Sequence, residues 1–158
     1  MIMEVNKMAE YYTKEPDRIY VTKEDRKIID KIDETNYFGL RNQDTARSDL
    51  FLFAMALGVE TNAREKLTNS EGLTLSKSLT SELKAIFFAL FIKEKAGKEN
   101  LDAIADQEAV FKYAEEYANV GFNIIEDYQK NQKDTDLCWN LMKELDEQYE
   151  KNVKPLMN

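Results

Sequence analysis

Histidine is absent from this chain of 158 residues, and cysteine occurs only once. Without histidine there can be no Ser-His-Asp or Cys-His catalytic arrangement, no zinc site of the usual kind and no Glu-x-x-His pair of a di-iron bundle. A single cysteine excludes an internal disulfide and fits a reducing cytosol. The sequence therefore predicts no metal site, no cofactor and a cytoplasmic location.

Glycine and proline are also scarce, with five and two residues. This disfavours a β-sandwich or barrel, which needs many turns. The longest apolar runs, 50–59 and 85–92, are much shorter than the roughly 20 residues of a membrane-spanning helix, so we expect buried core helices there. The N-terminus lacks a basic region followed by an apolar stretch, so we expect no signal peptide. Neither a P-loop nor a G-x-G-x-x-G motif is present.

Acidic residues outnumber basic ones by 30 to 22, for a net charge of −8. The excess is concentrated in residues 101–150, which hold 13 acidic and 4 basic side chains, whereas all five arginines lie in the first half. The acidic part would repel a phosphate backbone, so any nucleic-acid contact must come from the N-terminal half. The simplest role of acidic helix faces is to keep a protein soluble.

Apolar residues recur at a helical period almost everywhere, which predicts an all-α fold: a single domain over 1–158, built as a bundle of five or six helices. The one alternating segment, 18–22, predicts a short extended arm. We expect helices over about 2–12, 23–34, 44–58 (from Asp44 or Thr45), 81–96 (capped by Ser78, Thr80 or Ser81), 106–130 (from Asn100 or Asp106) and 135–154 (capped by Asp134 or Thr135).

Several positions carry specific structural expectations. Thr22 can cap the second helix, with Asp25 at its third position. Gly58 is expected to end the third helix in a Schellman-type turn, and Gly121 to mark a close helix crossing. Residues 73–75 could pair with the arm. The centre of the core is expected at four residues from two helices that are apolar nearly all round: Phe53, Leu57, Phe88 and Phe91.

Carboxylates are the main chemical groups left. Glu115 and Glu116 are neighbours on a helix and point about 100° apart, so they cannot both face one metal or substrate. Residues 134–136 lack the remaining ligands of a calcium loop and are more typical of a helix cap. Acidic neighbours would raise the pKa of the Cys138 thiol, so we expect it to be packed rather than nucleophilic. We predict no enzymatic activity; a carboxylate-based hydrolase is the remaining catalytic alternative.

Residues 18–59 combine an alternating arm, a capped helix, a loop and a helix that opens Ala46-Arg47-Ser48. This order resembles the ribbon-helix-helix DNA-binding layout, and it is similar to the small helical protein of DNA sulfur-modification operons. The ribbon-helix-helix resemblance implies that the arms of two copies pair and enter the major groove. Arg18, Tyr20 and Thr22 would then point toward bases, while the backbone amides near Arg47 and Ser48 would hold a phosphate.

A second resemblance rests on residues 47–59 together with 114–121, which resemble small uncharacterised helical proteins of prokaryotes, some of them found near defence genes. That family has no established activity, so the resemblance implies no catalytic residue and favours an accessory role. We therefore expect an accessory or regulatory protein that works by binding, with another protein as its partner. The alternative is direct DNA binding through Arg18, Tyr20, Thr22, Arg47 and Ser48.

A binding measurement with duplex DNA distinguishes these two hypotheses. If the chain acts as an adaptor, the acidic segment should repel a labelled duplex even at about 50 mM salt, where phosphate contacts are strongest, and we expect this outcome. A DNA-binding arm should instead bind the duplex. Arg18→Ala and Arg47→Ala should then each weaken binding and lower the salt slope by about 1. Tight binding in fluorescence anisotropy that both substitutions abolish would contradict the adaptor hypothesis.

Overall fold

The structure is a computed structural model that describes residues 13–38, 46–95, 106–131, 134–152 and 154–156, without the side chains of 134–138. The helix predicted over 2–12 and the side chain of Cys138 lie outside the described residues. The elements that it describes are β1 (Arg18–Thr22), α2 (Lys23–Thr35), α3 (Arg47–Glu60), β2 (Ser70–Leu75), the 3-10 turn η1 (Ser76–Ser78), α4 (Ser81–Lys95), α5 (Gln107–Asn131), α6 (Asp134–Asn152) and the 3-10 turn η4 (Lys154–Leu156).

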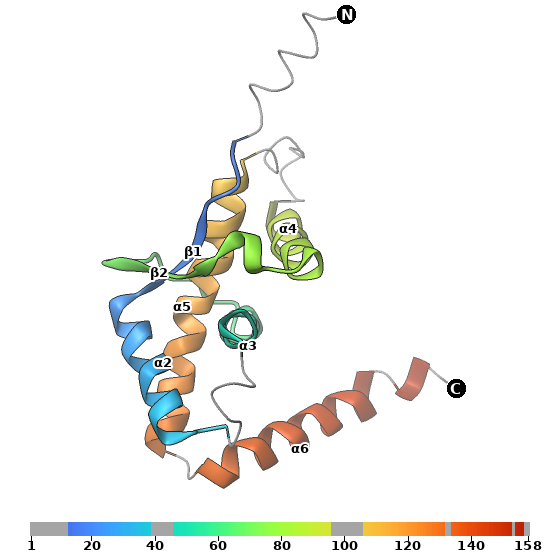
Figure 1. The fold of residues 1–158 in the computed structure, drawn as a ribbon. Helices are drawn as coiled ribbons and strands as arrows, with labels where there is room; N and C mark the ends of the chain where they lie inside the picture. The colour runs from blue at the N-terminus through green and yellow to red at the C-terminus, as the bar shows by residue number, and fades with distance from the viewer. Residues whose placement is uncertain (1–12, 39–45, 96–105, 132–133, 153, 157–158) are drawn as a thin grey trace, which may run out of the picture.

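The long helix α5 is the centre of the fold, and α2, α3, α4 and β1 all pack against it. Figure 1 shows α2 on one side of α5, α3 and α4 on the other, and α6 leading away from this body. The described residues thus form five α-helices and one two-stranded sheet. The fold is mostly helical as predicted, but the sheet means that it is not purely all-α.

The sheet pairs β1 with β2 in antiparallel register, from Arg18 opposite Leu75 to Thr22 opposite Ser70, with an irregularity between Ile19 and Tyr20. The predicted arm and its pairing with residues 73–75 are both confirmed. Side chains alternate as the sequence indicates: Ile19 is buried, whereas Arg18 and Tyr20 are exposed. This alternation turns one face of the arm toward α5.

Polar side chains mark the starts of the helices. The hydroxyl oxygen of Thr22 accepts the backbone N–H of Asp25, and the Asp25 carboxylate accepts the N–H of Thr22, so the predicted capping box is present. Thr80 accepts the N–H of Leu83 at the start of α4, and Asp106 accepts the N–H of Ala109 at the start of α5. Each cap satisfies an N–H that the first turn leaves without a helical partner.

Helices α3 and α5 cross with their backbones in near contact. A β-carbon on Gly121 would overlap the carbonyl oxygen of Ala54, and one on Gly58 would overlap that of Tyr117. The predicted close crossing at Gly121 is confirmed. The predicted helix end at Gly58 is wrong, because α3 continues to Glu60 and Thr61 caps it in a right-handed conformation. Gly58 serves the crossing rather than the end of the helix.

The core is centred on α5. Phe51, Phe87 and Phe111 are fully buried and meet edge to face, with ring centroids 5.7 and 5.4 Å apart. Among the four predicted core residues, Leu57 and Phe91 are buried, whereas Phe53 and Phe88 are only partly buried. The prediction fails for these two because α3 and α4 each have a face that no described helix covers completely.

The α3–α5 crossing generates a stability prediction. Gly58→Ala should lower the free energy of unfolding by about 2 kcal/mol or more, since overpacking against a backbone carbonyl outweighs the gain of about 1 kcal/mol in helix propensity. Gly72→Ala is the matched control. There the β-carbon would come within 2.8 Å of the Arg18 Cδ, which belongs to a flexible side chain that can move. Urea titration measures the free energy of unfolding of both variants. Equal decreases in the two variants would contradict this account of the crossing.

Candidate functional site

The residues proposed for DNA contact do not share one environment. Arg18 and Tyr20 are exposed on β1, as that hypothesis needs. Thr22 is 5% exposed, and its hydroxyl is used by the α2 cap. The alternation predicted for the arm therefore ends at Thr22, because the chain turns there from strand into helix.

Arg47 is engaged with α2. Its guanidinium forms an ion pair with Asp33 through both Nη atoms, and the Nη1–Oδ1 distance is 3.2 Å. Ser48 is partly buried beside it. Arg18 begins β1, whereas Asp33 lies near the end of α2, and Figure 1 shows these two ends far apart. The structure therefore does not bring Arg18 and Arg47 together, and their role in DNA binding stays a prediction.

The edges of β1 also have partners within the chain. One edge pairs with β2, and the backbone N–H of Tyr20 donates to Oε1 of Glu115 on α5 at 2.8 Å. In the ribbon-helix-helix layout, the arm instead pairs with the arm of a second copy. In this structure, β1 instead pairs with β2 of the same chain.

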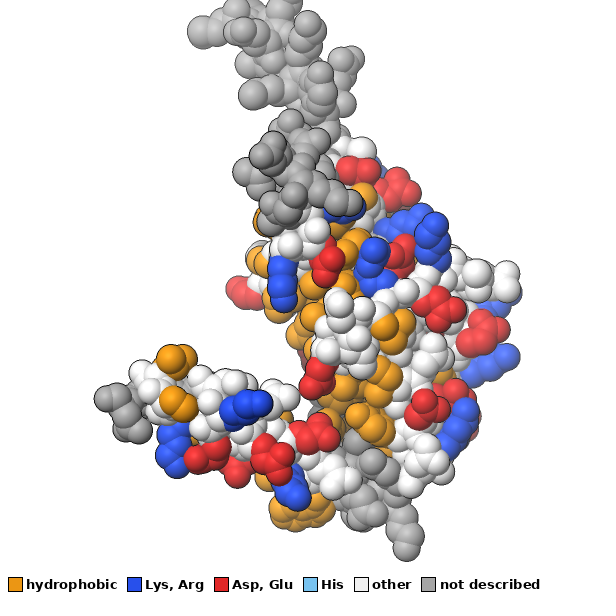
Figure 2. Space-filling view, turned by 180° about the vertical axis from the view of Figure 1, so that it is seen from behind, with side chains coloured by type: hydrophobic (Ala, Val, Ile, Leu, Met, Phe, Trp, Pro, Cys, Tyr) orange, Lys and Arg blue, Asp and Glu red, His pale blue; other side chains and the backbone are white. Residues whose placement is uncertain are grey.

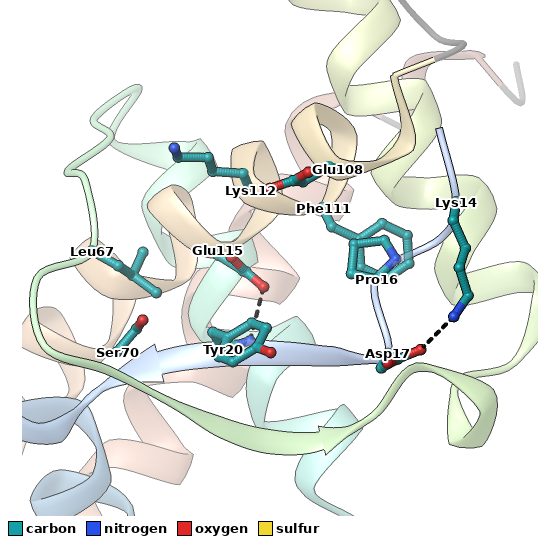
Figure 3. A pocket seen from close by; sticks show the side chains of 10 residues that line it. All are labelled: Lys14, Pro16, Asp17, Tyr20, Leu67, Ser70, Glu108, Phe111, Lys112 and Glu115. Carbon is teal, nitrogen blue, oxygen red and sulfur yellow. Dashed lines mark hydrogen bonds and ion pairs between the residues drawn. The ribbon is translucent and has the colours of Figure 1, made fainter. Parts of the chain in front are cut away.

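A pocket of about 440 Å³ lies where β1 meets α5. Figure 3 shows Glu115 pointing from α5 toward Tyr20, with Lys112 and Glu108 on neighbouring turns of the helix. Burial is the main cause that raises the pKa of Glu115 to about 7, and the charges of Glu116 and Glu108 raise it further. The hydrogen bond from Tyr20 and the charge of Lys112 lower it in part. The carboxyl group thus holds the arm against α5.

Glu116 turns to a different part of the molecule. Its Oε2 accepts from Nη1 of Arg64 at 2.7 Å, and the Arg64 guanidinium lies 4.0 Å from the centre of the Tyr113 ring. The predicted divergence of Glu115 and Glu116 is confirmed. Both side chains are buried and act in packing, one toward the arm and one toward the loop that follows α3. Among the described residues no group of three acidic or cysteine side chains could hold a metal ion.

A second, more apolar hollow lies between α3, α4 and α6, and we call it the α3–α4–α6 groove. Its volume is about 680 Å³. Figure 2 shows the hollow between α6 and the body, with apolar surface on the side of the body that faces α6. The groove is lined chiefly by apolar side chains, among them Leu52, Phe53, Ile86, Leu90, Leu141 and Leu145.

Helix α6 also carries apolar side chains into solvent. Trp139, Met142 and Leu145 are 67, 59 and 65% exposed, and we call these three the α6 stripe. Leu141 and Leu145 line the groove, whereas Trp139 lies two residues before Leu141 and points about 200° away from it around the helix. Helix α6 therefore has apolar surface on the side of the groove and on its outer side.

The sequence indicates the apolar residues of this region but not their exposure. The nearly all-round apolar character of α3 and α4 predicts deep burial, and the apolar face of α6 predicts that this helix packs in the same bundle. The sequence carries one signal for this exposure: two helices that are apolar nearly all round need cover on every side, and α6 covers them only in part.

Together, the fold and these surfaces define a mainly helical, acidic protein whose most prominent feature is an uncovered apolar surface. No described helix is long and apolar enough to cross a membrane. Over residues 18–156 the chain matches the family described as DNA sulphur modification system-associated protein 4, and it belongs to that family. This confirms the resemblance to a small protein of DNA sulfur modification. No curated protein and no solved structure was found to match the chain.

The raised pKa of Glu115 predicts a pH-dependent stability. Because the folded state holds this proton more tightly than the unfolded state, stability falls as the pH rises from about 4.5 to about 7. Glu115→Gln keeps an oxygen for the Tyr20 N–H and removes the charge. We expect it to flatten the pH dependence above pH 6 and to stabilise the protein at pH 8, by on the order of 1–3 kcal/mol.

Burial also raises the pKa of Asp25, to about 6. The stability of the Glu115→Gln variant therefore still decreases with rising pH below about pH 6. The control is Glu116→Gln, the same change one residue along, which weakens the ion pair with Arg64 and should destabilise at pH 8. Thermal melts at several pH values measure both variants. If Glu115→Gln destabilised the protein at pH 8 as Glu116→Gln does, burial would not raise the pKa of the Glu115 carboxyl group in the folded state.

Proposed function

We propose that this protein is a non-enzymatic accessory component of a DNA sulfur modification system and that it acts by binding another protein of that system. The observation that carries this proposal is the α6 stripe, three large apolar side chains that are more than half exposed on one helix. Family membership supports the accessory role and supplies the system in which the partner is sought.

Apolar exposure of this kind favours a protein partner. Soluble proteins seldom expose contiguous apolar patches larger than a few hundred Å², and the largest patches that they expose are often interaction sites. Tryptophan and methionine are enriched in protein interfaces, and tryptophan is prominent among the residues that dominate binding energy. On this proposal, Trp139 and Met142 are the anchors that the partner buries.

The net charge of α6 also favours a protein partner over DNA. Residues 134–152 carry six acidic and two basic side chains, for a net charge of −4. A DNA backbone would be repelled by this helix, whereas a protein with a basic rim around an apolar pocket would be attracted to it. The acidic residues then set the choice of partner, and the apolar ones hold it.

The test uses two double variants that each change the net charge by −2. Trp139→Asp with Met142→Asp places the charges in the α6 stripe, and Asn140→Asp with Lys143→Gln places them on an exposed polar side of the same helix. We expect the first to weaken binding to a protein of the sulfur modification system at least about thirtyfold, because buried anchors contribute about 2 kcal/mol or more. The second should retain binding.

Binding is measured by titration calorimetry against each purified protein of the system, after circular dichroism has shown that both variants keep the wild-type melting temperature. Wild-type protein that binds none of them would contradict the proposal. Equal losses in the two double variants would also contradict it, since the effect would then come from charge and not from the stripe.

A further inference from the structure

The α3–α4–α6 groove has a regular apolar wall. Leu52 and Ala56 follow each other at one-turn spacing on α3, and Ile86 and Leu90 do so on α4. Figure 1 shows α3 and α4 nearly end on, so their axes lie close to the line of sight, while α6 lies below them in this view. Rows of side chains one turn apart are the ridges against which another helix packs.

The length of the apolar wall indicates the length of the helical surface that can bind against it. The lining residues of α3 run from Leu52 to Glu60, about 12 Å of helix, and those of α4 from Ile86 to Leu90, about 6 Å. An apolar stretch of about two helical turns, about 11 Å long, would meet both ridges on one side and Leu141 and Leu145 of α6 on another. When an amphipathic helix binds in an apolar groove, the groove contacts apolar side chains at positions i, i+3, i+4 and i+7 of that helix.

The charge of the groove indicates the polar part of the ligand. The charged side chains that line it are Glu60 from α3 and Glu144 from α6, both acidic. Both lie beside apolar residues, so a bound helix would bring its flanks close to them. Lysine or arginine on those flanks would be attracted, whereas aspartate or glutamate would be repelled.

A second copy of this chain is a poorer occupant. Its α6 would bring a net charge of −4 to a groove that is already acidic, and the two chains would each carry −8. Like charges at this density oppose association. The groove therefore favours a partner of the opposite sign.

We infer that the α3–α4–α6 groove binds one amphipathic helix of a partner protein, with an apolar face about two turns long and lysine or arginine flanking that face. The inference rests on the proposed function, and it adds the chemistry of the partner and a second contact surface, which shares only Leu145 with the α6 stripe. The bound helix would cover Phe53, Ile86 and Leu90, three of the apolar side chains that the described fold leaves incompletely buried.

The test uses a synthetic probe. A fluorescein-labelled 14-residue peptide carries leucines at i, i+3, i+4 and i+7 and lysines elsewhere. A second peptide has the same composition in an order that gives no apolar face, and a third replaces every lysine with glutamate. We expect fluorescence anisotropy to show saturable binding of the first peptide to the full chain, weakening with salt, and little binding of the other two.

Two double variants locate the binding. Ile86→Ser with Leu145→Ser removes exposed apolar contacts without changing charge and should weaken binding tenfold or more. Glu60→Gln with Glu144→Gln keeps the apolar wall and should weaken binding roughly fivefold, with a smaller salt dependence. The charge-matched control is Glu71→Gln with Glu126→Gln, which removes two carboxylates from outside the groove and should bind as wild type.

Three results would overturn the inference. The first is equal binding of the peptide that has no apolar face, and the second is unchanged affinity in both groove variants. The third is a wild-type dimer in analytical ultracentrifugation that Ile86→Ser with Leu145→Ser dissociates, since a second copy would then occupy the groove. If the peptide fails but the α6 stripe variants lose a protein of the modification system, this inference alone is wrong and the proposed function stands.

Discussion

The near-contact of the α3 and α5 backbones is the constraint on which the rest of the structure depends. Gly58 and Gly121 each face a backbone carbonyl of the opposite helix, so neither position has room for a side chain. This close approach seats Phe51 against α5, where it meets Phe87 in the centre of the core. It also uses the small-residue side of α3 completely, which leaves the larger residues Leu52 and Phe53 on the side that faces the groove.

Helix α5 supports the remaining elements through two adjacent carboxyl groups. Glu115 accepts the backbone N–H of Tyr20 and so holds the arm, whereas Glu116 pairs with Arg64 and so holds the loop after α3. The same loop is tied to α5 by the side-chain amide of Asn119, which donates to the carbonyl of Glu65. Adjacent residues on a helix diverge by about 100°, so one turn of α5 organises two sides of the molecule.

Local patterns predicted the local structure well. The Thr22 cap, the alternating arm, its pairing with residues 73–75 and the close crossing at Gly121 follow from residue types and spacing, and the structure contains all of them. The prediction that α3 ends at Gly58 is wrong because a glycine near the end of an apolar run is compatible with two roles. It can end a helix, or it can allow a second helix to pack closely. The groove was not predictable in this way, because it depends on where α6 lies, and no periodicity within α6 encodes its partner.

The distribution of charge acquires a different meaning once burial is known. The sequence assigns the acidic excess to residues 101–150 as a whole, but Glu115 and Glu116 are buried within α5 and contribute little to the outer field. Much of the remaining excess lies on α6, the helix that also exposes Trp139 and Met142. Negative charge and apolar surface therefore occur on the same element and beside the same groove. Because an acidic field attracts a basic partner and repels a phosphate backbone, the helix that exposes the apolar surface also selects what can reach it.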